Sequence, residues 1–144
     1  MSDILFEKVL VPVNASDLSE RVVIQVARLI RSGIVGEVVL MSVWEADKID
    51  YTKLHASDKE TKLKNQAREV LQKYSTQLKE QGIEVKTNLS GGDPSELILQ
   101  EVKKGKYDLI IMGSRKLNKL QELMFGSVSD RVTRLCSVPV LVVK

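Results

Sequence analysis

The alternation of short apolar runs with helix-length amphipathic segments constrains the fold of this 144-residue chain more than any other feature. Strands that alternate with helices pair in parallel, and right-handed crossovers place helices on both faces of the sheet. The sequence therefore predicts a single-domain, Rossmann-like α/β fold over residues 1–144, with an open parallel five-stranded sheet in the order 3-2-1-4-5. The expected strands are 8–13, 37–43, 83–89, 107–112 and 140–143.

Helical periodicity and capping residues predict four helices between these strands. Ser16 or Asp17 suits the start of the first helix, and Ser57 suits the start of the second, with Glu60 completing a capping box. Asp93 followed by a proline is the best-defined helix start in the chain. The expected helices are 17–32, 58–81, 94–105 and 127–135.

Composition and charge exclude several classes of protein. The chain is 43% apolar and 28% charged, as globular domains are. Its net charge of +3 comes from interspersed residues, which argues against a nucleic-acid partner. No apolar run reaches the ~20 residues of a membrane span, and Asp3 and Glu7 interrupt any signal-peptide pattern. Because Cys136 is the only cysteine, we expect no disulfide framework and a cytoplasmic location.

Residues 108–128 carry the clearest sign of a ligand site. An apolar strand ends at Gly113, a basic loop with Arg115 and Lys116 follows, and Gly126 with Ser127 precedes the last helix. Glycine lets a backbone approach a phosphate closely, and the N–H groups at a helix start favour an anion. A plain strand-to-helix connection with a solvated basic loop would have the same composition.

The predicted topology points to the same loop independently. Ligands of open α/β sheets bind beyond the carboxyl ends of the strands, where the strand order reverses. In the order 3-2-1-4-5 this point lies between the first and fourth strands. Pro12, Val13 and Asn14 would then face Gly113 and the residues after it across one crevice.

Three parts of the chain resemble the universal stress proteins, small α/β proteins related to the adenine-nucleotide α-hydrolases. Residues 8–16 resemble the family's first strand and turn, and residues 139–143 resemble its last strand. Between them, the residues from Gly113 to Ser127 follow the spacing of the family's ATP-binding signature, which is Gly, two residues, Gly, nine residues, Gly and then Ser or Thr. The resemblance covers essentially the whole chain.

The resemblance implies a stress-response sensor or switch that binds ATP, with or without Mg²⁺. It also implies a homodimer formed through the final strand, which here runs from Val138 to Val143. Phosphates would lie over the loop that begins at Gly113 and over the start of the last helix. The implied nucleotide contacts are Pro12, Val13, Asn14, Val43, Met112, Gly113, Arg115, Lys116, Gly126, Ser127, Val128 and Ser129.

Two residues depart from the family pattern. Lys116 replaces the second signature glycine, where its side chain either fills the space of a phosphate or supplies an ammonium group to it. Asn14 replaces the usual aspartate; it still hydrogen-bonds a hydroxyl through its oxygen or its amide, but it lacks the carboxylate that favours a metal. We therefore expect weaker or metal-independent nucleotide binding.

The sequence offers little for catalysis. No residues near His55 in the sequence would form a catalytic group or a metal site with it. Cys136 suits a buried structural thiol. Gly91 and Gly92 suit a tight turn. Without an evident general base or metal cluster, at most slow ATP hydrolysis is expected. The main alternative is a dimeric interaction scaffold that binds no nucleotide.

Overall fold

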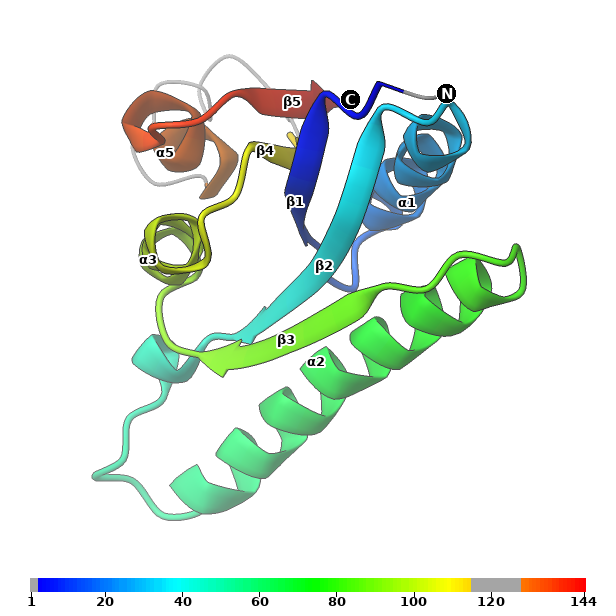
Figure 1. Cartoon of the computed structure of the whole chain (residues 1–144). Coiled ribbons are helices and arrows are strands. Elements are labelled where there is room, and N and C mark those ends of the chain that lie inside the picture. The colour runs from blue at the N-terminus through cyan, green and yellow to red at the C-terminus, as the bar shows by residue number, and fades with distance from the viewer. Residues whose placement is uncertain (1–2, 115–127) are drawn as a thin grey trace.

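Five parallel strands form one sheet in the order β3-β2-β1-β4-β5, as predicted (Figure 1). The computed structural model describes residues 3–114 and 128–144. The elements are β1 (Phe6–Pro12), α1 (Asp17–Arg31), β2 (Val35–Trp44), the 3₁₀ helix η1 (Ala46–Lys48), α2 (Ala56–Lys79), β3 (Lys86–Gly91), α3 (Pro94–Gly105), β4 (Leu109–Gly113), α5 (Val128–Leu135) and β5 (Val140–Val143).

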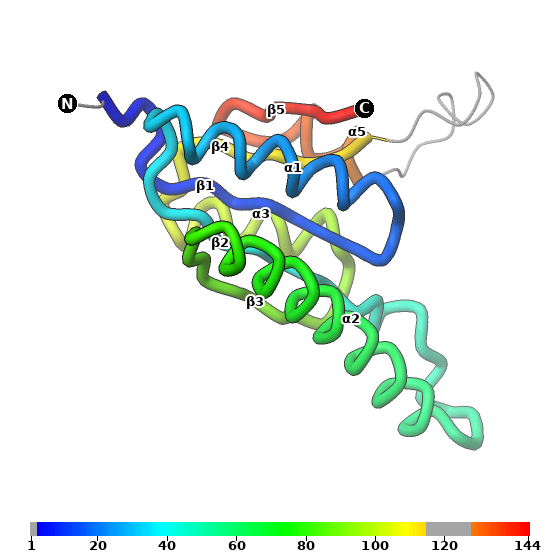
Figure 2. Tube along the Cα trace, turned by 90° about the vertical axis from the view of Figure 1, so that its right-hand side faces the viewer, coloured from blue at the N-terminus to red at the C-terminus, as the bar shows by residue number. Residues whose placement is uncertain are grey.

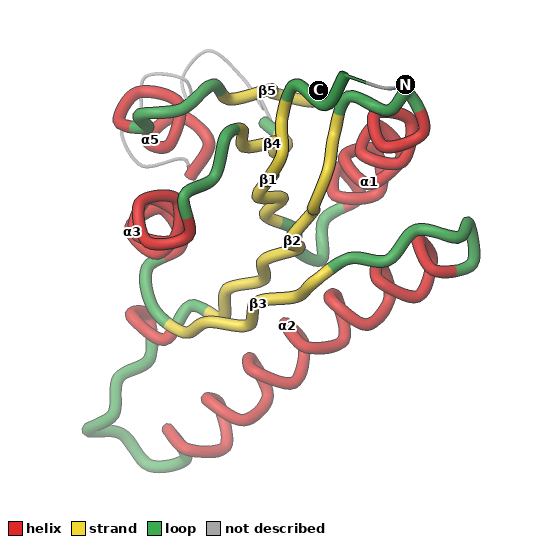
Figure 3. The backbone as a smooth tube through the Cα atoms, viewed as in Figure 1, coloured by secondary structure: helices red, strands yellow, loops and turns green. Residues whose placement is uncertain are grey.

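Helices cover both faces of the sheet, as the crossovers require (Figure 3). Alternate residues of β1 point to opposite faces. Val9 and Val11 pack with α1 and α2, whereas Leu10 packs with α3 and α5. All three are fully buried, which explains why the central strands are continuously apolar.

Two strands begin later than predicted because the chain still makes a hydrogen bond to the preceding helix. The Ile83 N–H donates to Leu78 O at the end of α2, so β3 begins at Lys86 and not at residue 83. Likewise, the Tyr107 N–H donates to Val102 O of α3, so β4 begins at Leu109. Both apolar side chains are nevertheless buried in the core.

The predicted cap of α3 is confirmed, and the predicted cap of α2 is wrong. Asp93 Oδ2 accepts a hydrogen bond from the Glu96 N–H at 3.1 Å, directly before the first turn of α3. Helix α2 begins at Ala56, before Ser57, because the Lys59 N–H already donates to His55 O.

The segment between β2 and α2 projects beyond the sheet together with the start of α2 (Figure 2). It contains η1 and two exposed apolar side chains, Tyr51 and Leu54. His55 is also exposed, and its Nδ1 lies 3.3 Å from Asp58 Oδ2. His55 is therefore a surface residue at the start of α2.

No helix in the described part of the chain is both long enough and apolar enough to cross a membrane.

Candidate functional site

The strand order reverses between β1 and β4, and this point brings together two of the predicted segments. β1 pairs with β2 on one side and with β4 on the other, all in parallel. The carboxyl ends of β1 and β4 therefore lie at one edge of the sheet (Figure 2). Residues 12–14 and 113–114 lie at these ends or directly after them, so they are neighbours at the place where open α/β sheets bind ligands.

Two serines join the end of β4 to the start of α5. Ser129 Oγ donates a hydrogen bond to Ser114 Oγ at 3.2 Å, and the Ser114 N–H donates to Val143 O of β5 at 3.0 Å. Ser129 is buried. The first turn of α5, whose leading N–H groups have no acceptor within the helix, therefore lies against the end of β4.

Several predicted contact residues belong to the core, so only their backbone is suited to meet a ligand. The Val13 side chain packs beneath α1 and α2, and its N–H donates to Met41 O. Met112 packs beneath α3 and α5 and is 3% exposed. Pro12 is half-buried at the end of β1.

Gly113 packs closely against side chains of α1. A Cβ atom at this position would lie 2.6 Å from Leu18 Cγ and 3.3 Å from Val22 Cγ2. Carbon atoms do not approach this closely without displacement of the neighbour. From the sequence, a glycine at this position was expected to let a phosphate approach the backbone. The structure gives a second reason for glycine, which is the close packing of Leu18 and Val22 of α1 against this position.

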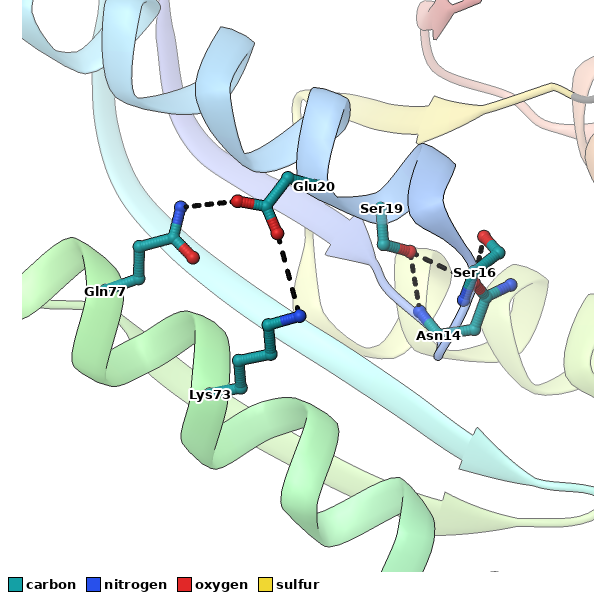
Figure 4. Close-up of polar contacts among 6 residues, drawn as sticks. All are labelled: Asn14, Ser16, Ser19, Glu20, Lys73 and Gln77. Atoms are coloured by element: carbon teal, nitrogen blue, oxygen red, sulfur yellow. Dashed lines mark hydrogen bonds and ion pairs between the residues drawn. The ribbon is translucent and has the colours of Figure 1, made fainter.

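Asn14 is held rigidly in the turn between β1 and α1 (Figure 4). Its Oδ1 accepts hydrogen bonds from the Ser16 N–H at 2.9 Å, from Ser16 Oγ at 2.6 Å and from Ser19 Oγ at 3.1 Å. The Asn14 N–H in turn donates to Ser19 Oγ at 2.8 Å. Ser16 is the N-cap residue of α1. Its hydroxyl donates to Asn14 and caps no helix N–H, contrary to the predicted cap.

Val43 lies on β2, two residues beyond the pair that Met41 forms with Pro12. It is half-buried and packs against the α3 and α5 side of the sheet. The next residue, Trp44, places its indole against Gly91 of β3, where an added Cβ would overlap the ring. The register with β1 therefore places Val43 near the end of that strand.

The sequence did not predict a polar cluster formed by Asp93, Ser95 and Arg131. Arg131 of α5 donates to Ser95 Oγ at 3.1 Å and lies 3.4 Å from Asp93 Oδ2 at the start of α3. Ser95 Oγ also donates to Asp93 Oδ2 at 3.0 Å. These bonds fix α5 relative to α3. The sequence predicted Asp93 only as a helix cap, because no sequence pattern links it to Arg131, which is far away along the chain.

Four predicted contacts lie outside the described residues: Arg115, Lys116, Gly126 and Ser127. Within residues 3–114 and 128–144, no three His, Cys, Asp or Glu side chains gather where they could hold a metal ion. Cys136 is half-buried at the end of α5 and packs against the α3 and α5 side of the core.

Comparison with known proteins adds relatives over the full length of the chain. A sequence model of the universal stress protein family matches residues 5–144. Universal stress protein YxiE of Bacillus subtilis is 28% identical, over 97% of this chain and 100% of its own. The solved structure of MJ0577, from Methanocaldococcus jannaschii, superposes with a TM-score of 0.82 at 28% identity, covering 98% of this chain and 97% of that one.

A universal stress protein of Archaeoglobus fulgidus, solved in complex with dAMP, shares the fold with a TM-score of 0.67 at 21% identity, over 98% of this chain and 100% of that chain.

Proposed function

This chain belongs to the universal stress protein family, and we propose that it is a cytoplasmic sensor or switch that binds ATP across the ends of β1 and β4. The contact between Ser129 and Ser114 carries the proposal, because it sets the first turn of α5 beside the reversal point of the sheet. A helix start at such a point suits a phosphate group. The dAMP complex of the A. fulgidus protein indicates that this fold accommodates an adenine nucleotide.

The described residues fit a nucleotide better than they fit a resident metal. The β1 end offers an amide at Asn14, and the β4 end offers the Ser114 hydroxyl. Magnesium prefers carboxylate and phosphate oxygens. We propose that Gly113, Arg115, Lys116, Gly126, Ser127, Val128 and Ser129 surround the phosphates, with Pro12, Val13, Asn14, Val43 and Met112 on the nucleoside side.

We also propose that two copies of the chain associate through β5. This strand is at an edge of the sheet, and an edge strand presents unpaired backbone groups to a partner. Leu141 is 42% exposed on it. Pairing with a twofold mate would cover both the backbone edge and this side chain.

ATP should raise the midpoint of thermal unfolding of the purified protein. A ligand at 100 times its Kd stabilises the folded state by about 2.7 kcal/mol, which corresponds to a rise of roughly 5–10 °C for a domain of this size. Scanning fluorimetry with increasing ATP measures the shift. Mass spectrometry of the denatured protein would detect an adenine nucleotide that co-purifies with it.

The Lys116→Gly variant decides the role of this lysine in the same assay. A lysine that contacts a phosphate should weaken ATP binding about tenfold when removed, whereas a lysine that fills the site should strengthen binding when removed. An unchanged midpoint at millimolar ATP, in both proteins, would favour the competing function, a dimeric scaffold without nucleotide.

A further inference from the structure

The side-chain oxygen of Asn14 has no capacity left for a ligand. An amide oxygen offers two lone pairs, and this one already receives three donors, from the Ser16 N–H, Ser16 Oγ and Ser19 Oγ. Ser19 is 5% exposed, so its bond is shielded from water. The oxygen is therefore part of the start of α1 and is not part of the ligand-facing surface.

The amide nitrogen of Asn14 is the atom that remains for a ligand. The Ser16 backbone N–H is an obligatory donor, so the atom that it meets must be the oxygen and the amide cannot be flipped. Nδ2 points away from Ser19 and from the body of α1 (Figure 4). Within residues 3–114 and 128–144 it makes no hydrogen bond, and Asn14 is exposed.

We propose that Asn14 is a specificity-determining residue whose side chain presents only N–H donors at the end of β1, so that the site takes the nucleotide without a divalent cation at this position. This inference rests on the proposed nucleotide site. An amide N–H binds an oxygen of the ribose or of a phosphate directly. It repels a metal ion, which needs an oxygen ligand.

The change Asn14→Asp replaces the N–H donors of Nδ2 by a negatively charged acceptor oxygen, and we expect little effect on the fold. One carboxylate oxygen would keep the three donors from Ser16 and Ser19, and the second would replace Nδ2. An Asp at the start of α1 also suits the helix dipole. The site would then present a negative charge, which repels the phosphates unless Mg²⁺ lies between them.

Titration calorimetry with ATP, in EDTA and in MgCl₂, tests the inference. We expect the wild-type protein to bind ATP in EDTA at least as tightly as in MgCl₂. For Asn14→Asp we expect affinity in EDTA to fall about tenfold or more, since the hydrogen bond that Nδ2 donates to the nucleotide is lost and a negative charge is added beside ATP. Addition of MgCl₂ should restore it to within about threefold of the wild type.

Asn88→Asp is the matched control. Asn88 is on β3, two strands from β1, and its Oδ1 also accepts a serine hydroxyl, that of Ser90. The variant adds the same charge to a side chain that also accepts a serine hydroxyl but lies outside the proposed site, so its ATP affinity should equal that of the wild type in both buffers.

A second variant keeps the test decisive if Asn14→Asp does not fold. Asn14→Ala removes the donor and adds no charge, so its ATP affinity should fall by a similar factor in EDTA and in MgCl₂. Its melting midpoint should also fall, because the bonds to Ser16 and Ser19 are lost.

The possible outcomes separate this inference from the proposed function. If the wild type needs Mg²⁺ for binding, or if Asn14→Asp binds like the wild type in EDTA, the inference is wrong and the nucleotide site stands. If the wild type binds no ATP in either buffer, the proposed function itself is contradicted, and the inference falls with it.

Discussion

Replacing Gly113 by alanine should lower the free energy of unfolding by about 1–3 kcal/mol, as overpacking of a well-packed core does. The new Cβ would lie 2.6 Å from Leu18 Cγ and 2.7 Å from Leu18 Cδ2, so the Leu18 side chain, or α1 with it, must move away from the end of β4. Each kcal/mol corresponds to roughly 2–4 °C in the melting midpoint of such a domain. Calorimetry or circular dichroism measures the loss.

A double-mutant cycle with Leu18→Ala tests the cause of this loss. If the clash with Leu18 is responsible, Gly113→Ala should cost less in the Leu18→Ala background than in the wild type, by about 1 kcal/mol. Purely additive effects would contradict the packing explanation. An unchanged midpoint in Gly113→Ala alone would show that the position does not require glycine.

Replacing Leu141 by arginine should halve the mass of the particle in solution. Leu141 is exposed on β5, the edge strand through which we propose that the homodimer forms. A twofold interface would place two such arginines close together in an apolar contact, where burial of unpaired charge is costly. Light scattering at micromolar concentration measures the mass.

Leu54→Arg is the matched control for this test. Leu54 is 87% exposed on the segment before α2, so the same substitution there should leave the mass unchanged. A wild-type protein that is already monomeric, or a Leu141→Arg protein that remains dimeric, would overturn the proposed interface.

The fold was predictable because its signals are local or follow from general topology. Residues 140–143 form a strand with the predicted bounds, and Asp93 caps α3 as its spacing indicates. The strand order was a topological expectation, and it places the reversal between β1 and β4 as expected. Continuous apolar strands already indicated a sheet that is covered on both faces.

The wrong prediction for the cap of α2 has a physical origin in the chain before the helix. Ser57 is a good capping residue by type, but the preceding turn brings His55 into the left-handed conformation, with φ at 68°, and α2 begins from there. Side-chain preference for a cap is worth about 1 kcal/mol, so the conformation of the connecting chain readily overrides it.

The sequence predicted where the candidate site lies in the fold, but it did not predict which contacts the individual side chains make there. Gly113 was correctly placed at the end of β4, yet its contact with Leu18 joins residues that are far apart in sequence. The link from Arg131 to Asp93 escaped detection for the same reason. The bonds of Asn14 are local, so an Asn followed by serines two and five residues on was a signal that could have been found.

The measurement that tests the central claim most directly is a map of backbone amide chemical shifts in the ¹⁵N-labelled protein during titration with ATP. Binding across the ends of β1 and β4 predicts saturable shifts at Asn14, Ser114 and Ser129, with Lys106 and Tyr107 at the opposite edge of the sheet unchanged. Shifts concentrated at that opposite edge, or no shift at millimolar ATP, would contradict the nucleotide site.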